Sequence, residues 1–280
     1  MQRTSCSVAM SLATAVALLA AGSARGSSQV VPPAAAPANS VTYVANSGFL
    51  LRAGGKAILI DALFDGFPGG YTIPASVREP LLAGRPPFDG IDLILATHDH
   101  GDHFSAAAVR RALESNPRAV FVGPAAAVAA LTGLGDRARA LDVEVGQRGT
   151  LEVNGIRIDA MRLSHGTPPP GRPDIVNLAY LVTAGGVKFF HTGDIDVNVI
   201  PMSYLQGLGV RDDHVDVAFV PHFLLGLPFP LPFVTEGIRP RFVVASHLQY
   251  TGAPPNEDQI RRNFPTAVPL RTEGERWVIP

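Results

Sequence analysis

The chain has 280 residues, and its 23 lysines and arginines nearly balance its 24 aspartates and glutamates, which gives a formal net charge of −1 at pH 7. With this balance and no basic stripe, the composition excludes the electrostatic footprint of a nucleic-acid-binding protein and favours a small-molecule or lipid-like substrate. The one cysteine, Cys6, excludes a disulfide framework, and beyond the N-terminus no run approaches the roughly 20 apolar residues that a membrane-spanning helix needs.

The N-terminus has the composition of an export signal. Arg3 is the only charged residue before an apolar stretch over residues 8–21, and small residues follow at positions 22 to 24 and 26. We expect residues 1–26 to be a signal peptide that is removed on export, so the protein is predicted to be periplasmic or secreted. Residues 27–40 are rich in proline and alanine without apolar periodicity, which indicates a flexible linker before one domain over residues 41–280.

The domain is predicted to consist of short strands with helices between them. The strand candidates are apolar or β-branched runs between turn residues, at residues 41–44, 49–52, 56–60, 91–97, 119–123, 151–153, 156–163, 177–183, 187–191, 215–220 and 241–245. The helix candidates, bounded by capping residues or prolines, are residues 105–115, 125–134 and 257–263. Meandering strands with interspersed helices predict an α/β fold in which two sheets pack face to face with helices outside.

The feature that points most directly to chemistry is the run His98-Asp99-His100-Gly101-Asp102-His103, which follows an apolar strand candidate. Alternating residues of a turn project in similar directions, so His98 and His100 can bind one cation, and Asp102 and His103 are placed to bind a second one nearby. Neutral imidazole and carboxylate are ligands that suit zinc, manganese or iron(II). The run therefore predicts a metal site at the C-terminal end of a strand.

Further histidines and aspartates also follow predicted strands. These are Asp61, His165, His191, Asp194, Asp196, His222 and His247. Gly193 allows the backbone to come close to a metal while Asp194 points inward. Asp196 is expected to be structural or solvated, and His214 to lie on the solvated surface.

Residues 222–233 are unusually apolar for a segment with three prolines. Proline excludes a central strand and a regular helix interior, so the segment is predicted to be an apolar loop. Either it packs on the core, or it makes a subunit contact in a homo-oligomer, or it lines the metal cleft and favours an apolar substrate. In the last case the wall of the cleft comprises Phe64, Phe67, Tyr71, Phe223, Leu224 and Phe229.

The motif His-x-His-x-Asp-His over residues 98–103 resembles the signature of the metallo-β-lactamase fold hydrolases, and the later candidates fit that superfamily in order and spacing. The resemblance covers roughly residues 41 to 250. It implies a four-layer αβ/βα sandwich with metals at one edge between the two sheets. The spelling His-Thr-Gly-Asp over residues 191–194 looks like the branch of the ascorbate-phosphate lactonases and the N-acyl-phosphatidylethanolamine phospholipase D.

The resemblance also implies two divalent cations, zinc in the first place and manganese or iron(II) as the other candidates. It assigns His98, His100 and His165 to one cation, Asp102, His103 and His247 to the other, and Asp194 as a bridge between them. His222 is an alternative to His247 as the last histidine ligand, but the superfamily has this ligand near the C-terminus, which favours His247. Asp61 is expected to orient the histidine-bearing loop by hydrogen bonds, and His191 to support the site.

Hydrolysis is the reaction that this ligand set implies, because a hydroxide that bridges two cations attacks an ester, lactone, amide or phosphodiester. Asp102 would orient the hydroxide and accept its proton, and His222 is a candidate for substrate contact or proton transfer. Val197 stands where the acyl-homoserine lactonases carry a tyrosine, so their substrate clamp is missing. Two alternatives stay open at this point: an iron-dependent oxidoreductase of the same fold, and a metal-binding protein without turnover.

Overall fold

The computed structural model describes residues 38–66, 71–167, 174–227, 231–249 and 256–280. The predicted signal peptide and most of the predicted linker lie outside the described residues. Ser40, the last residue of that linker, already begins the first strand, and the Asn39 side chain accepts a hydrogen bond of 3.2 Å from the Gly54 N–H. Within the described ranges, no helix has the length and apolar character that crossing a membrane requires.

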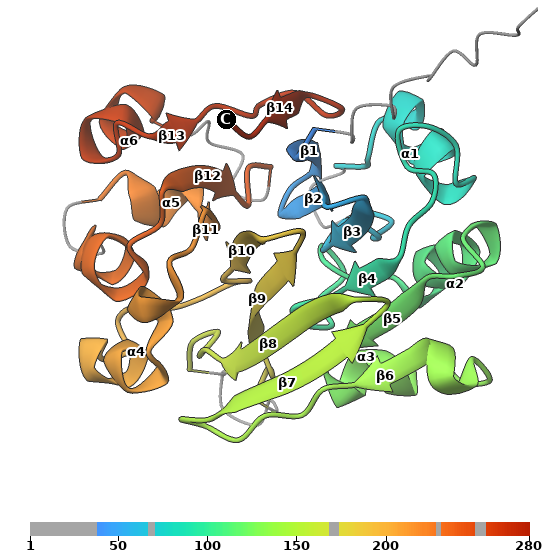
Figure 1. The fold of residues 1–280 in the computed structure, drawn as a ribbon, viewed down its shortest axis with the longest axis horizontal. Coiled ribbons are helices and arrows are strands. Elements are labelled where there is room, and N and C mark those ends of the chain that lie inside the picture. Colours follow the sequence, from blue (N-terminus) through green and yellow to red (C-terminus); the bar gives the residue numbers. More distant parts are fainter. Residues whose placement is uncertain (1–37, 67–70, 168–173, 228–230, 250–255) are drawn as a thin grey trace, which may run out of the picture. The chain divides into compact units, whose positions relative to one another are not determined.

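Two sheets form the centre of the described domain, and each has seven strands (Figure 1). The first runs in the spatial order β14 (Arg276–Val278), β1 (Ser40–Ala45), β2 (Gly48–Ala53), β3 (Lys56–Ile60), β4 (Leu93–Leu95), β5 (Val120–Gly123) and β6 (Ala138–Ala140). The second runs in the order β13 (Ala267–Val268), β12 (Phe242–Ser246), β11 (Val217–Pro221), β10 (Val187–His191), β9 (Leu178–Ala184), β8 (Ile156–Arg162) and β7 (Arg148–Val153).

Both sheets change from antiparallel to parallel pairing part of the way across. In the first sheet β1, β2 and β3 pair antiparallel, and β3 to β6 pair parallel. In the second sheet β7 to β10 pair antiparallel, and β10 to β13 pair parallel. The carboxyl ends of the parallel strands meet at one edge of each sheet, which is where α/β proteins place their ligand sites.

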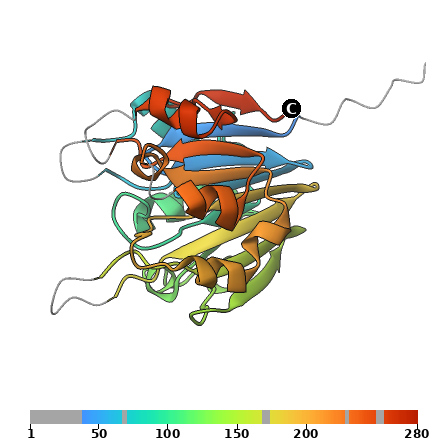
Figure 2. The ribbon, with the colours of Figure 1, turned by 90° about the vertical axis from the view of Figure 1, so that its left-hand side faces the viewer.

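Helices cover the outer faces of both sheets. Against the first sheet lie α1 (Ala75–Leu82), α2 (Ala106–Ser115) and α3 (Ala125–Ala129), and against the second lie α4 (Met202–Leu208), α5 (His222–Leu225), α6 (Glu257–Asn263) and the π-helical segment Phe233–Ile238. Figure 2 looks onto the second group, whose orange and red helices lie in front of their sheet. Among the described residues, two short 3₁₀ helices, Gly135–Arg137 and Val210–Asp213, lie in the connections between these elements.

The core consists of three apolar layers. Phe49 and Leu51 pack between the two sheets, whereas Leu50 between them packs against the helices, because successive side chains of a strand point to opposite faces. A corresponding layer lies between the second sheet and α4 to α6. The predicted four-layer αβ/βα sandwich is therefore confirmed.

Two glycine turns from different sheets touch each other. Gly54 lies in the β2–β3 turn and Gly185 in the β9–β10 turn, and both have a positive φ, of 56° and 53°. A Cβ atom added to Gly54 would lie 2.3 Å from the Cα atom of Gly185, and the reverse substitution would give the same distance. Only glycine allows this approach, so the two hairpins meet at their turns.

Some predicted elements were wrong in extent. The helix expected over residues 125–134 ends at Ala129, because the chain turns before Gly133, which has a φ of 82°. The segment over residues 222–233 was expected to contain no helix, yet α5 begins directly after Pro221, and a proline before the first helical residue is compatible with a helix start. Helices α1 and α4 were not predicted from the sequence.

Candidate metal centre

The predicted ligands come from loops at the carboxyl ends of strands in both sheets. In the first sheet, His98, His100, Asp102 and His103 follow β4. In the second sheet, His165 follows β8, Asp194 follows β10 and His247 follows β12. Because the two sheets pack face to face, these loops meet over the same edge of the sandwich.

The structure brings all these side chains together in two groups. The first group is His98, His100 and His165, and the second is Asp102, His103, Asp194 and His247. Within each group the atoms that can bind a metal lie within 4.8 Å of one another. The grouping matches the division that the resemblance implied, and the role of each residue as a ligand stays a prediction.

In the first group, hydrogen bonds determine which ring nitrogen of His98 is free for a metal. The Thr97 hydroxyl donates to Asp61 Oδ2 at 2.7 Å, so its oxygen accepts from His98 Nδ1–H at 3.0 Å. His98 Nε2 therefore carries no proton, and it lies 3.2 Å from His100 Nδ1. Burial, and then the neighbouring imidazole of His103, hold the pKa of His98 well below its usual value, so the ring is neutral, as a metal ligand must be.

In the second group, one oxygen of Asp194 lies between several imidazoles. Asp194 Oδ2 is 2.8 Å from His247 Nε2, 3.3 Å from His103 Nε2 and 3.8 Å from His165 Nε2. Asp102 Oδ2 lies 3.5 Å from His103 Nε2 and 3.6 Å from His247 Nε2. Asp194 thus reaches histidines of both groups, which is the geometry expected of a bridging carboxylate.

Charges in the second group compensate each other. Burial alone would raise the pKa of Asp194, but the imidazoles of His103 and His247 outweigh it and hold this pKa well below its usual value. Burial alone would lower the pKa of His103, but the carboxylates of Asp194 and Asp61 outweigh it and raise this pKa well above its usual value. A carboxylate that is mostly buried, with 15% of its side chain exposed, needs a positive partner, either a protonated histidine or a cation.

The donor atoms fit a divalent cation. His103 Nε2, His165 Nε2 and Asp194 Oδ1 are buried, and none has a hydrogen-bond partner among the described residues. Buried polar atoms nearly always have such a partner, so three exceptions in one place need an explanation. Imidazole and carboxylate in this number suit zinc, manganese or iron(II), and a cation in each group would satisfy these atoms.

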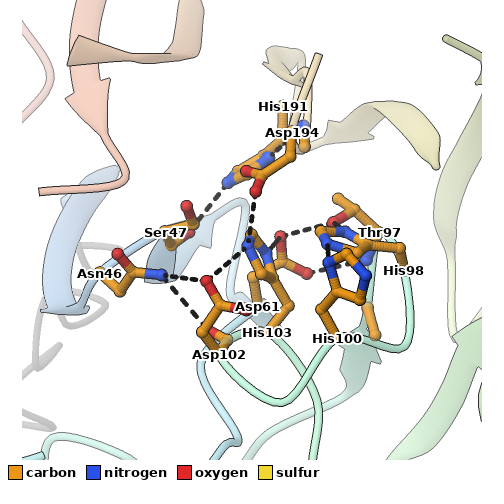
Figure 3. A network of polar contacts seen from close by, with 12 residues as sticks. Asn46, Ser47, Asp61, Thr97, His98, His100, Asp102, His103, His191 and Asp194 are labelled. Atoms are coloured by element: carbon orange, nitrogen blue, oxygen red, sulfur yellow. Dashed lines mark hydrogen bonds and ion pairs between the residues drawn. The ribbon is translucent and has the colours of Figure 1, made fainter. Parts of the chain in front are cut away.

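Asp61 orients the loop that carries the histidines (Figure 3). Its Oδ1 accepts from the Thr97 N–H at 2.8 Å, and its Oδ2 accepts from the Thr97 hydroxyl and from His103 Nδ1–H, the latter at 2.8 Å. When the ring is neutral, as a metal ligand must be, this bond keeps the proton on Nδ1 and leaves Nε2 free on the side of the second group. Such outer hydrogen bonds fix the tautomer and direction of a ligand, as was predicted for Asp61.

On the other sheet, Gly193 and Asn177 position Asp194. Gly193 has a φ of 62°, and a Cβ atom there would lie 2.1 Å from Asn177 Oδ1. Asn177 Oδ1 accepts from the Asp194 N–H at 3.2 Å, and Asn177 Nδ2 donates to Thr192 O at 3.0 Å and to Leu163 O at 3.2 Å. One asparagine thus joins the loop of Asp194 to the strand end before His165, a role that sequence reasoning missed.

His191 supports the same loop and is not part of either metal group. Its Nδ1 accepts from the Gly193 N–H at 3.0 Å, and its Nε2–H donates to Ser47 O at 2.9 Å. Burial lowers the pKa of His191, and the hydrogen bond that Nδ1 accepts requires the neutral ring. His191 therefore ties the loop before Asp194 to the β1–β2 turn.

A cleft of about 390 Å³ opens over the two groups. Its lining consists of His100, Asp102, His165, Asp194, Ile195, Phe223 and His247. Phe223 is 37% exposed, and its ring stands edge-on to His247 with 5.8 Å between centroids. Ile195 and Phe223 give the cleft an apolar wall beside the polar groups.

Most of the other predicted wall residues lie elsewhere. Leu224 and Phe64 are buried in the layers between sheet and helices, so these two predictions were wrong. Tyr71 packs against the same layer as Phe64, and its hydroxyl donates to Glu273 at 2.8 Å. Phe67 and Phe229 lie outside the described residues.

The remaining candidates lie outside the metal groups. His222 is buried beside Phe223, and burial, followed by the nearby His247, lowers its pKa. It does not line the cleft in the described part of the chain, and its catalytic role stays a prediction. Asp196 Oδ1 accepts hydrogen bonds from the Asn198 backbone and side chain at 2.9 and 2.7 Å, a structural role, and His214 is exposed.

Comparison with known proteins identifies the family. The sequence model of the β-lactamase superfamily domain matches residues 56–226. The chain belongs to the metallo-β-lactamase superfamily. The predicted superfamily is therefore confirmed, whereas the branch within it stays a prediction.

The relatives are named as metal-dependent hydrolases. A UPF0173 metal-dependent hydrolase of Thermococcus kodakarensis is 30% identical over 223 residues, which cover 77% of this chain and 86% of the relative. A UPF0173 metal-dependent hydrolase of Nitratidesulfovibrio vulgaris is 30% identical over 166 residues, which cover 56% of this chain and 59% of the relative. The predicted enzyme class agrees with these names.

A solved structure shows the same fold. The metallo hydrolase Igni18 of Ignicoccus hospitalis superposes with a TM-score of 0.59 at 18% identity, over 86% of this chain and 98% of Igni18. At 18% identity, this similarity shows that the helices and strands have the same arrangement.

Proposed function

We propose that the protein is a hydrolase that uses two metal ions and acts on an ester, lactone, amide or phosphodiester. Zinc is the first candidate for both ions. The observation that carries the proposal is the position of Asp194, whose Oδ2 lies within 4 Å of imidazoles in both groups. The donor set in each group supports one cation, and the seven donor residues exceed what one tetrahedral site uses.

Bound cations of this kind supply a hydroxide near neutral pH and polarise a carbonyl or phosphoryl oxygen. The residues of the chain hold the geometry for that chemistry. Asp102 lines the cleft and its Oδ2 faces His103 and His247. A carboxylate at this place can orient the attacking water and accept its proton.

The names of the relatives support hydrolysis over the two alternatives. An iron-dependent oxidoreductase would use the same donor set with a different metal, and a non-catalytic protein would need a blocked site. The lining of the cleft over both groups includes Phe223, which is 37% exposed, and this exposure supports an accessible site. Ile195 and Phe223 support a substrate with an apolar part, and the composition of residues 1–26 supports export to the periplasm or the medium.

Metal analysis followed by a substrate panel tests the proposal. Protein purified without chelator is expected to contain about two equivalents of zinc per chain, and to hydrolyse one class within a panel of esters, lactones, amides and phosphodiesters. Removal of metal should abolish the activity, and zinc should restore it. One equivalent that persists under metal supplementation contradicts the binuclear site, and a fully loaded but inert protein supports a role without turnover.

A further inference from the structure

Asn46 lies outside both metal groups and contacts Asp102 through its side chain (Figure 3). It lies in the β1–β2 turn and is completely buried. Its Nδ2 group donates to the backbone O and to the Oδ2 atom of Asp102, both at 3.3 Å. Because both partners are acceptors, the amide must present its NH₂ group here.

The backbone of Asn46 is attached to the segment that carries His247. Its N–H donates to Gln249 Oε1 at 2.7 Å, and its carbonyl accepts from the Leu248 N–H at 3.4 Å. Asp102 follows β4 of the first sheet, and His247 follows β12 of the second. Asn46 therefore contacts Asp102, which follows a strand of the first sheet, and also the segment of His247, which follows a strand of the second sheet.

Two polar side chains form hydrogen bonds with Gln249, and a third bonds to one of these two. The Tyr43 hydroxyl donates to Gln249 Oε1 at 2.5 Å, and Gln249 Nε2 donates to Glu273 Oε1 at 3.1 Å. The Tyr71 hydroxyl donates to the same Glu273 oxygen. These bonds fix the amide orientation of Gln249, which gives Asn46 a rigid support.

The position accepts asparagine and few other residues. Asn46 has a φ of 49°, a conformation that asparagine, aspartate and glycine adopt more easily than other residues. Glycine lacks the amide, and aspartate would place a second carboxylate beside that of Asp102. The Asn46 Oδ1 atom is buried without a hydrogen-bond partner among the described residues, an energetic cost that the fold retains.

We propose that Asn46, supported by Gln249, is a positioning residue that sets the affinity of the second metal group without affecting the first. The inference rests on the binuclear function proposed above. Within the described part of the chain, the hydrogen bonds of Asn46 and Gln249 reach Asp102 and the segment of His247, and none of them reaches His98, His100 or His165. Hydrogen bonds of this outer kind typically change metal affinity by about 10- to 100-fold.

Two variants, one at Asn46 and one at Gln249, test whether these residues set the affinity of the second group. Asn46→Gly keeps the positive φ and the backbone bonds but removes the amide, and Gln249→Leu removes the acceptor of the Asn46 N–H. Asn154→Gly is the matched control: Asn154 lies in the β7–β8 turn with a φ of 52°, and its Nδ2 donates to Asp92 O and Arg118 O, remote from both groups. Stepwise zinc binding to the metal-free full chain is measured by calorimetry, and Co²⁺ loading by visible absorption.

In both variants one of the two zinc-binding steps should become about 10- to 100-fold weaker than in the unmodified protein while the other keeps its affinity, and the Co²⁺ spectrum should change for the weakened step. The control should bind both equivalents as the unmodified protein does. Unchanged affinities, or an equal loss at both steps, overturn the inference while the binuclear proposal stands. An unmodified protein that binds one equivalent overturns both.

Discussion

Asp61 and His103 form a buried pair in which the aspartate Oδ2 accepts a hydrogen bond of 2.8 Å from His103 Nδ1–H. Asp61 has a φ of 47°, which asparagine also tolerates. In Asp61→Asn the amide can turn its NH₂ group towards His103, which favours the tautomer with the proton on Nε2. We expect the variant to fold and to bind the second metal about 10- to 100-fold more weakly, as measured by calorimetry.

The control for this experiment is Asp196→Asn, because Asp196 follows Asp194 closely but bonds to Asn198. Its metal affinity should equal that of the unmodified protein. If both variants bind zinc normally, Asp61 has no influence on the ligand that it contacts.

Asp194→Asn should reduce metal content and activity more than the substitutions of Asn46, Gln249 or Asp61. A neutral amide cannot bridge two cations, and the imidazoles of His103 and His247 lose the carboxylate that lies 3.3 and 2.8 Å from them. Metal content should fall from about two equivalents to one or fewer, and hydrolysis by at least about 100-fold. Equal metal content and activity in Asp194→Asn and Asp196→Asn would show that the bridge is misplaced.

Gly193→Ala should destabilise the fold through Asn177. The new methyl group would lie 2.1 Å from Asn177 Oδ1, and alanine at a φ of 62° carries about 1–2 kcal/mol of backbone strain in addition. Gly186→Ala is the matched control, since its φ is 81° and no atom lies within 4 Å of the new methyl group. Urea unfolding should show the loss from strain alone in the control and a clearly larger loss in Gly193→Ala. If the two variants lose the same unfolding free energy, the Asn177 side chain moves away from the new methyl group without an energetic cost.

His191 should make the metal-free protein sensitive to acid. Burial lowers its pKa in the folded state, so below the unfolded value of about 6.5 the unfolded chain binds a proton that the folded chain does not. The contribution to stability is therefore complete above about pH 6.5 and is lost as the pH falls below it, by up to about 1.4 kcal/mol per pH unit.

The measurement compares the unfolding free energy at several pH values with that of His191→Gln. The variant is expected to be less stable at every pH but to lose less stability between neutral and mildly acidic pH. Parallel curves for the two proteins would assign the acid sensitivity to other groups.

Phe223→Ala should affect apolar substrates selectively. The ring lines the cleft and is partly exposed, and loss of such an apolar contact costs about 1–3 kcal/mol of substrate binding. KM should rise far more for long-chain than for short-chain esters, with unchanged metal content. Val199→Ala, an exposed apolar residue outside the cleft lining, is the control, and equal losses for all chain lengths would remove Phe223 from the substrate site.

The sequence allowed the four-layer sandwich and the loops of the site to be predicted, because these features depend on local patterns. Short apolar strands alternate with turn residues, and the motif over residues 98–103 is contiguous. His165, Asp194 and His247 could be placed by resemblance in order and spacing.

The supporting asparagines could not be predicted in the same way. Asn46 contacts Asp102 from 56 residues away, and the Asp194 backbone contacts Asn177 from 17 residues away. Both contacts depend on how separate strand ends meet in space, whereas each asparagine alone resembles an ordinary turn or strand residue. Leu224 and Phe64 were misplaced because an apolar segment next to a site does not reveal which side chains face inward.

The contact between Gly54 and Gly185 affects how the two sheets can move relative to each other. From these two turns β3 and β10 both run five residues towards the metal groups; Asp61 follows β3 directly, and Asp194 lies three residues after the end of β10. The sheets thus touch at the turn end, and at the opposite end hydrogen bonds of His191 and Asn46 join them beside the donors from both sheets. Cations that bind donors of both sheets there would add further links between the sheets, so metal loading should raise the melting temperature of the whole domain and not only order the loops of the site.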